Sequence, residues 1–447
     1  MKVKRFFASA VSFAIMISAG SLFAYAEEQI QDVGEPLTDG TFTFELVGGS
    51  YTITSCESTA IINDIPELRN GYAVTAIGDN AFANCTNISS LKIPDSITSI
   101  GSNAFAGCTS LKSITLPSRI TAISSGMFMG CTNLASIDIP DSVNTISSYA
   151  FYNCSFLTDV RLPGELSSIQ PMAFAECSSI ENFDSSACAS YKFEDGILYN
   201  SSKTNICRAS AKLTGDVYIP DGVTTIDAGA FSVCAGIENL FIPSSVSFIG
   251  EDSFGYCTSL KSIDFSEGLS SIADVAFKNC VSLQTLDFPL SLQEIGEGAF
   301  FNCTSLSRAV IAEGTKSVGT GAFTSCSSLK QINLPSSITE IGDYAFGFLL
   351  DENGGYVPDD GFSMSVFSDS ACAKYAKSNK IEYTTVDGSL KNLAFIIVGI
   401  GVIIVVVVFA VVLMAKSRKS ASSAVKKADK EAQEKAEEEN YKKIIDN

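Results

Sequence analysis

The residues that could carry chemistry in this chain are cysteines and carboxylates, because its 447 residues include no histidine. The chain therefore lacks the usual general base, the commonest metal ligand and the partner that activates a catalytic serine or cysteine. Among 49 acidic residues, Asp359 and Asp360 are adjacent, but they follow the turn-rich stretch 352–358. A solvated turn is favoured over an acid and base pair there. The sequence predicts no enzyme, no cofactor and no metal site.

Fourteen cysteines would ordinarily indicate a disulfide framework in a secreted protein, but their spacing here argues otherwise. Ten of them recur every 23 residues, in two blocks. This spacing would stack the cysteines of adjacent coils about 4.8 Å apart, which is beyond the usual distance between the Cβ atoms of a disulfide. We interpret these ten as a ladder of buried free thiols. Four others lie off the ladder, and a Cys188–Cys207 bridge stays open as an alternative.

The net charge of −19 and the pI near 4.5 argue against nucleic-acid binding, which depends on clustered Lys and Arg. Residues 27–415 carry 18 basic and 42 acidic side chains, so the acidity belongs to the body of the chain. A solvated coat that keeps a long protein soluble is the favoured interpretation of this charge. Attraction of cations or basic partners is the alternative.

The two ends of the chain predict its location. Residues 1–26 have three basic residues, an apolar run and a closing Ala-Tyr-Ala, which is typical of a secretory signal peptide. Residues 393–415 contain no charge and are long enough for one transmembrane helix. Basic residues gather just after this segment, so we expect the tail 416–447 in the cytoplasm and the remainder outside.

A 23-residue repeat fills the region between these ends, and a period of this size predicts a solenoid. Phenylalanine recurs in two blocks, and cysteine follows at the third position after each of the first ten. The phenylalanines are Phe82, Phe105, Phe128, Phe151 and Phe174, then Phe231, Phe254, Phe277, Phe300, Phe323 and Phe346.

One repeat predicts one coil of the solenoid. Ile114 and Leu116 alternate with polar residues, as in a half-buried strand, and Pro117 ends that strand. A second apolar pair, Ile120 and Ile123, predicts a second short extended segment. A single coil has too little core, so burial depends on the coils above and below it.

The repeat also sets the expected boundaries. We expect an N-terminal cap over 27–78, the solenoid over 79–350, and a C-terminal cap with a juxtamembrane segment over 351–392. The step from Phe174 to Phe231 is longer than two periods, which fits two divergent coils with an insertion near 186–212. Turn residues in 195–202 predict a hairpin in that insertion.

The repeat pattern A-F-x-x-C-x-x-L-x-x-I-x-L-P-x-x-I-x-x-I resembles the leucine-rich repeat of BspA-like bacterial surface proteins, over nearly the whole segment between the two ends. The resemblance implies a leucine-rich repeat solenoid, rich in β-structure, with right-handed parallel coils. It also implies an adhesin or receptor displayed on the cell surface of host-associated bacteria, and it brings no catalytic residues.

Function is expected on the outward positions of the first strand of each coil. Tyr218 and Phe241 hold such positions on neighbouring coils, and Asp264 and Asp287 continue the column. These four residues are the predicted binding site for an extracellular protein or glycan, including one from a host. A structural spacer without a discrete ligand is the alternative. A carbohydrate-active enzyme is less favoured, because the repeat offers a flat face and no cleft.

Overall fold

The computed structural model describes residues 37–62 and 64–386. The predicted signal peptide, membrane helix and cytoplasmic tail lie outside these residues. Within the described ranges, no helix combines the length and apolar character that a membrane crossing requires.

Each 23-residue repeat forms one coil with two short strands and a loop. In the coil that contains Phe105, the first strand is Ser113–Thr115 and the second is Ala122–Ile123. Ile114 and Ile123 point inward and are buried. Most strands pair in parallel with their equivalents one period later, as Ser90 does with Ser113 and Thr145 with Ser168. The coils therefore stack into two ladders of parallel strands.

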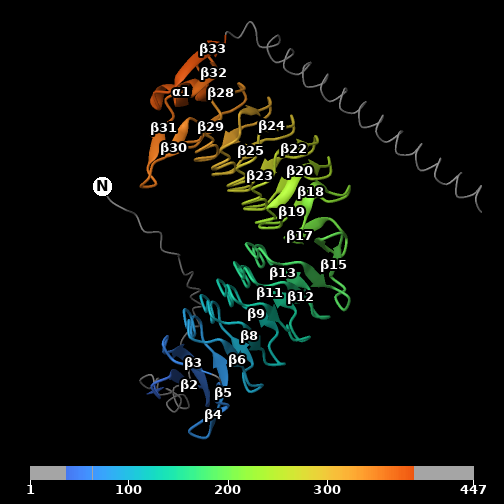
Figure 1. Ribbon diagram of the computed structural model, residues 1–447, viewed down its shortest axis with the longest axis vertical. Helices are drawn as coiled ribbons and strands as arrows, with labels where there is room; N and C mark the ends of the chain where they lie inside the picture. The colour runs from blue at the N-terminus through green and yellow to red at the C-terminus, as the bar shows by residue number, and fades with distance from the viewer. Residues whose placement is uncertain (1–36, 63, 387–447) are drawn as a thin grey trace, which may run out of the picture.

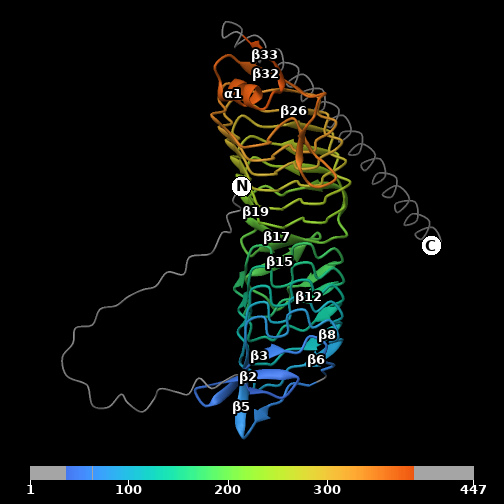
Figure 2. The ribbon, with the colours of Figure 1, turned by 90° about the vertical axis from the view of Figure 1, so that its left-hand side faces the viewer.

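The first strands form the first-strand sheet, and the second strands form the second-strand sheet. The first-strand sheet contains β6 (Ser90–Lys92), β8 (Ser113–Thr115), β10 (Ser136–Ile137), β12 (Asp159–Arg161), β14 (Asn182–Asp184), β18 (Thr214–Tyr218), β20 (Gly236–Ile242), β22 (Ser262–Phe265), β24 (Thr285–Asp287), β26 (Arg308–Val310) and β28 (Gln331–Asn333). The second-strand sheet contains β7 (Ser99–Ile100), β9 (Ala122–Ile123), β11 (Thr145–Ile146), β13 (Ser168–Ile169), β19 (Thr225–Ile226), β21 (Phe248–Ile249), β23 (Ser271–Ile272), β25 (Glu294–Ile295), β27 (Ser317–Val318) and β29 (Glu340–Ile341). Figure 2 shows β8, β12 and β26 along one long side of the rod, and β17, β19 and α1 along the other.

Both ends of the solenoid are capped by other elements. The N-terminal cap contains β1 (Leu37–Thr38), β2 (Phe42–Val47), β3 (Ser50–Cys56), β4 (Leu68–Arg69) and β5 (Tyr72–Ile77). The C-terminal cap contains the hairpin β30 (Phe348–Leu350) and β31 (Tyr356–Pro358), then β32 (Ser363–Phe367), α1 (Ala371–Ser378) and β33 (Glu382–Val386). Ser370 caps α1 by accepting a hydrogen bond from the Ala373 amide at 3.1 Å, and β32 and β33 extend the first-strand sheet.

The core is a column of stacked phenylalanine rings beside a column of thiols. Phe254 is fully buried, with its ring centroid 4.8 Å from that of Phe231 and 5.0 Å from that of Phe277. The Cys108 thiol donates to the Phe82 carbonyl oxygen on the preceding coil at 3.1 Å, and most other ladder thiols do the same. All fourteen cysteines are free, so the ladder carries no disulfide and Cys188 is not bridged to Cys207.

The solenoid has a joint between its two phenylalanine blocks. There β15 (Tyr191–Glu194), β16 (Ile197–Asn200) and β17 (Asn205–Ala209) form an antiparallel meander, and β17 pairs in parallel with β19. The connection from β15 to β16 is the turn Asp195-Gly196, where both residues have positive φ. Ile197 belongs to the C-terminal core cluster and Leu198 to the N-terminal one, so β16 lies between the two cores.

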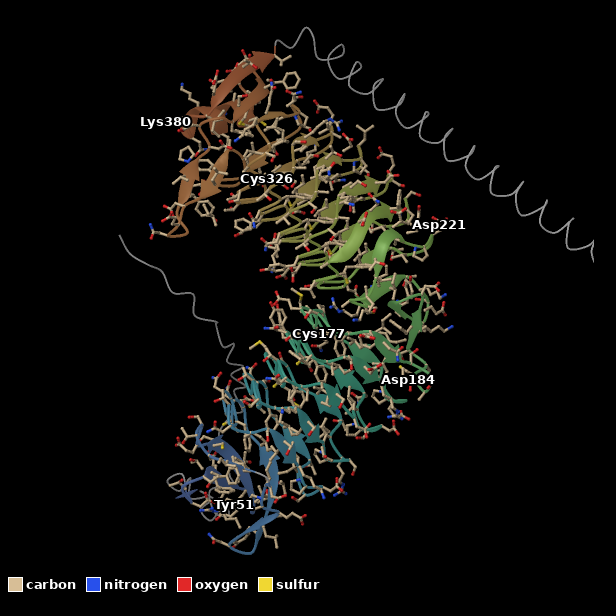
Figure 3. All side chains as sticks on the ribbon, viewed as in Figure 1. Tyr51, Cys177, Asp184, Asp221, Cys326 and Lys380 are labelled. Carbon is tan, nitrogen blue, oxygen red and sulfur yellow. The ribbon has the colours of Figure 1, made fainter. Side chains whose placement is uncertain are left out.

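At the joint, the first-strand side and the loop side are built differently. The first-strand sheet is interrupted, since β14 ends one sheet and β18 begins the next. The loop side stays stacked, and the Met172 amide donates to the Ala228 carbonyl at 3.4 Å. Figure 1 shows the arc of the rod. Figure 3 places Asp184 and Asp221, on either side of the joint, at the outer curve.

Candidate binding surface

Tyr218 and Phe241 form a stacked aromatic pair on the first-strand sheet. β18 pairs with β20 so that Tyr218 lies directly opposite Phe241. Their ring centroids are 4.3 Å apart and their planes differ by 5°. The Tyr218 side chain is 63% exposed and Phe241 is half-buried. Tyr218 is exposed because successive side chains of a strand point to opposite faces of the sheet, and Val217 and Ile219 on either side of it are buried.

The position of β18 gives Tyr218 a neighbouring strand on one side. β18 is the end strand of its eight-stranded sheet, and its strand partner among the described residues is β20. Phe241 covers the Tyr218 ring from that side. Because Tyr218 remains 63% exposed, a large part of the residue is accessible to a ligand. We call Tyr218 and Phe241 together the aromatic step.

The two predicted carboxylates differ in their contacts. Asp264 can contact a ligand, whereas Asp287 is held by Arg308. Phe241 pairs with Asp264 on β22, and Asp264 is exposed. Ser262 pairs with Thr285, which keeps Asp264 and Asp287 in the same column. Asp287 accepts two hydrogen bonds from the Arg308 guanidinium, at 2.6 and 3.0 Å. The aromatic step and Asp264 are therefore the part of the predicted site that is open to a ligand.

A row of polar side chains runs beside the aromatic step, and the sequence interpretation missed it. The Asn239 amide donates to Asp216 at 2.7 Å, and the Ser262 hydroxyl donates to Asn239 at 2.7 Å. These three residues hold one outward position on successive coils, two positions before Tyr218, Phe241 and Asp264. The 23-residue period could have found them. Arg308 could have been found in the same way, since it lies one period after Thr285 and pairs with it.

The surface offers aromatic stacking and hydrogen bonding but no assembled catalytic group. Asp359 is held by Lys330, whose Nζ lies 2.8 Å from its carboxylate, so Asp359 and Asp360 do not face each other as a free acid and base pair. Within the part of the chain that the structure describes, no three Asp, Glu or Cys side chains are grouped to hold a metal ion. Burial raises the pKa of several ladder thiols, to about 12 for Cys108 and about 11 for Cys177, so these are poor nucleophiles. Cys85 differs, because a hydrogen bond with Cys56 lowers its pKa.

A solenoid of parallel coils, each with an L-x-x-I-x-L strand and an exposed outer sheet, defines a leucine-rich repeat protein. The chain belongs to the BspA type leucine rich repeat region family, whose model matches residues 75–205 and 216–349 in six copies. The resemblance read from the repeat is thereby confirmed. Among curated proteins, no match to this sequence was found.

Solved structures agree with this assignment. A leucine rich cell surface protein from Faecalibacterium prausnitzii is 28% identical, with a TM-score of 0.52, and the match covers 70% of this chain and 95% of that one. A leucine-rich repeat protein from Eubacterium ventriosum is 23% identical, with a TM-score of 0.54 and coverage of 68% and 92%. The pneumococcal vaccine antigen PcpA shares the fold at 18% identity, with a TM-score of 0.57 and coverage of 79% and 99%.

Proposed function

We propose that this chain is a cell-surface protein that binds an extracellular macromolecule, a protein or a glycan, through its first-strand sheet. The similar protein from Faecalibacterium prausnitzii is described as a cell surface protein. The predicted signal peptide and membrane helix of this chain support the same location. The last described strand, β33, ends at Val386, just before the predicted membrane helix at 393–415. The C-terminal end of the rod would then face the cell.

The observation that carries this proposal is the exposed aromatic step beside Asp264, a carboxylate that forms no ion pair with the described residues. A stacked aromatic pair supplies a large apolar contact area at low cost in side-chain entropy. Asp264 and the row formed by Asp216, Asn239 and Ser262 supply hydrogen-bonding groups next to it. A few polar groups around an apolar contact are the usual composition of a binding site.

A screen followed by substitution tests the proposal. The full chain is first exposed to an array of glycans and matrix proteins. The dissociation constant of the strongest hit is then measured for the parent and for the double variant Tyr218→Ser with Phe241→Ser. Serine already holds outward positions elsewhere in the sheet, such as Ser113, so the fold should tolerate both changes. We expect the double variant to bind at least about tenfold more weakly, as loss of a binding hot spot predicts.

A matched control removes two exposed apolar side chains elsewhere. Phe156 and Leu290 are 61% and 65% exposed, and Phe156→Ser with Leu290→Ser should leave binding unchanged. Equal binding by the aromatic-step variant and the parent, with unchanged thermal unfolding, would place the ligand elsewhere. Failure of the whole array to bind would favour the alternative, in which the rod is a structural spacer.

A further inference from the structure

A groove runs along the second-strand sheet in the C-terminal half of the solenoid, whereas the aromatic step lies on the first-strand sheet. Its larger part has a volume of about 800 Å³ and is lined by β25, β27, β29 and α1. An adjoining part of about 450 Å³ is lined by residues of β21, β23 and the loops that follow them. The two parts share Asp274, Glu294 and Gly296, so they form one continuous flank groove.

The flank groove is strongly acidic, and its charge is not compensated by the protein. The carboxylates that line it are Asp227, Glu251, Asp274, Glu294, Glu297, Glu340 and Asp343, and Lys374 of α1 is the one Lys or Arg among the lining residues. None of the ion pairs formed by the described residues includes any of these carboxylates. The first-strand sheet differs, because it pairs Glu238 with Lys261 and Asp287 with Arg308.

The repeat itself shows that the coil does not need these charges in order to fold. Glu251, Asp274 and Glu297 each lie three positions before the phenylalanine of their coil, where three consecutive N-terminal coils have Ser102, Ser125 and Ser148. The outward position of the second strand is Glu294 in β25 and Glu340 in β29, but it is alanine, threonine and serine in β9, β11 and β13. The acidity is a local property of one flank of one half of the rod.

Two further observations at the groove point to a ligand. Phe248 of β21 lines the groove and is 39% exposed, although its register neighbours are Thr225 and Ser271. An aromatic face among carboxylates suits a cationic side chain. At the joint, Asp227 also lines an adjoining pocket of about 10 Å³ that lies beside the groove and contains Arg208. Arg208 is 1% exposed and its Nε–H has no acceptor among the described residues. A pocket of this size has room for one oxygen atom, which the unsatisfied donor suits.

We propose that the flank groove binds an extended basic segment of a partner protein. Lys or Arg side chains would lie over the carboxylates, and one of them over Phe248. From the coil of Asp227 to that of Asp343 there are five coil steps, which at about 4.8 Å each span about 24 Å. An extended chain of about seven residues covers that length. A Lys or Arg at every second residue would meet carboxylates contributed by nearly every coil.

A labelled peptide tests this proposal. A fluorescein-labelled peptide of alternating Lys and Ser is titrated with the full chain, and binding is followed by fluorescence anisotropy. The groove variant carries Glu294→Gln, Glu297→Gln and Glu340→Gln. The matched control carries Asp138→Asn, Asp159→Asn and Glu165→Gln, three exposed carboxylates of the N-terminal half that form no ion pair with the described residues. Both variants change the net charge by the same amount, and both remove only solvent-facing groups.

The groove variant should bind the peptide about tenfold more weakly, while the control stays within about twofold of the parent. Phe248→Ser alone should weaken binding about threefold, and Ser271 at the next coil shows that the strand accepts serine. Equal weakening by the two triple variants would reduce the effect to net charge and overturn the proposal. Unchanged binding by the groove variant would also overturn it. The aromatic-step variant should bind this peptide like the parent, which separates this site from the proposed function.

Discussion

Arg208 donates from Nη2 to the carbonyl oxygen of Cys177 at 3.1 Å, and this hydrogen bond joins the two halves of the solenoid. The same guanidinium donates from Nη1 to the carbonyls of Gly229 at 2.8 Å and Ser232 at 3.0 Å. Arg208 is 1% exposed and lies in the core. The coil that contains it has no phenylalanine loop, so Arg208 fills the space between the Cys177 and Cys234 coils and satisfies carbonyls that would otherwise be buried and unpaired.

Arg208→Met should therefore destabilise the protein strongly. Methionine can fill much of the volume but leaves several buried carbonyls without donors, at an expected cost of about 3–5 kcal/mol. The free energy of unfolding from urea titration checks this. Arg161 pairs with Asp141 at an exposed site, so Arg161→Met should cost no more than about 1 kcal/mol. A comparable loss for both variants would contradict the role given to Arg208.

The stacked phenylalanines should be the main source of stability in each half. Phe254→Ala removes a fully buried ring between Phe231 and Phe277 and should cost about 3–5 kcal/mol. Phe156→Ala, at an exposed site, should change stability by less than about 0.5 kcal/mol. Urea titration gives the free energy of unfolding of both variants. A small loss for Phe254→Ala would mean that the stacked phenylalanine rings are not the core of that half of the solenoid.

The cysteines should be free thiols in the isolated protein. Denatured, non-reduced protein should titrate with at least ten thiols, because the ladder thiols donate to carbonyls and are not bridged. In the folded protein the ladder thiols should react slowly with a thiol reagent, since they are buried. Titration with a thiol reagent, with and without denaturant, measures both quantities. Finding five or more disulfides would show that the ladder is covalently linked.

Stability should fall as the pH rises from about 9 to about 11. Burial raises the pKa of Cys177 and of Cys234 from 9.0 to about 11. Over that interval the unfolded chain releases these protons while the folded chain retains them, so a stabilisation that is complete below pH 9 is lost by about pH 11. The loss is about 1–3 kcal/mol for each such thiol. Midpoints of urea unfolding measured across this pH range test the expected loss of stability. Cys234→Ala should make the decrease with pH shallower. Stability that does not change over this pH range would contradict the prediction.

The predicted topology has its own test. If residues 393–415 span the membrane with the basic side inward, protease added to intact cells should remove the solenoid and leave the tail 416–447 protected. An epitope tag at each end followed by immunoblotting gives the result. Cleavage of the C-terminal tag from outside would reverse the orientation.

The sequence by itself determined the elements that repeat. Within each block, equivalent residues of adjacent coils are separated by one repeat period, so a period in the sequence corresponds directly to a contact in space. The Phe254 stack and the pairing of Tyr218 with Phe241 could both be predicted in this way. Exposure of Tyr218 followed from strand alternation, which needs no knowledge of distant residues.

The tertiary structure alone decided what happens where the period fails. Arg208 meets Cys177 at a separation of 31 residues, and Lys278 meets Glu176 across the joint. No repeat in the sequence encodes these separations. The flank groove is of the same kind, because it needs α1 of the C-terminal cap to lie beside the second-strand sheet. Periodicity specifies neighbours one coil away, whereas the joint and the groove depend on how an irregular meander and a terminal helix pack against coils that are not their sequence neighbours.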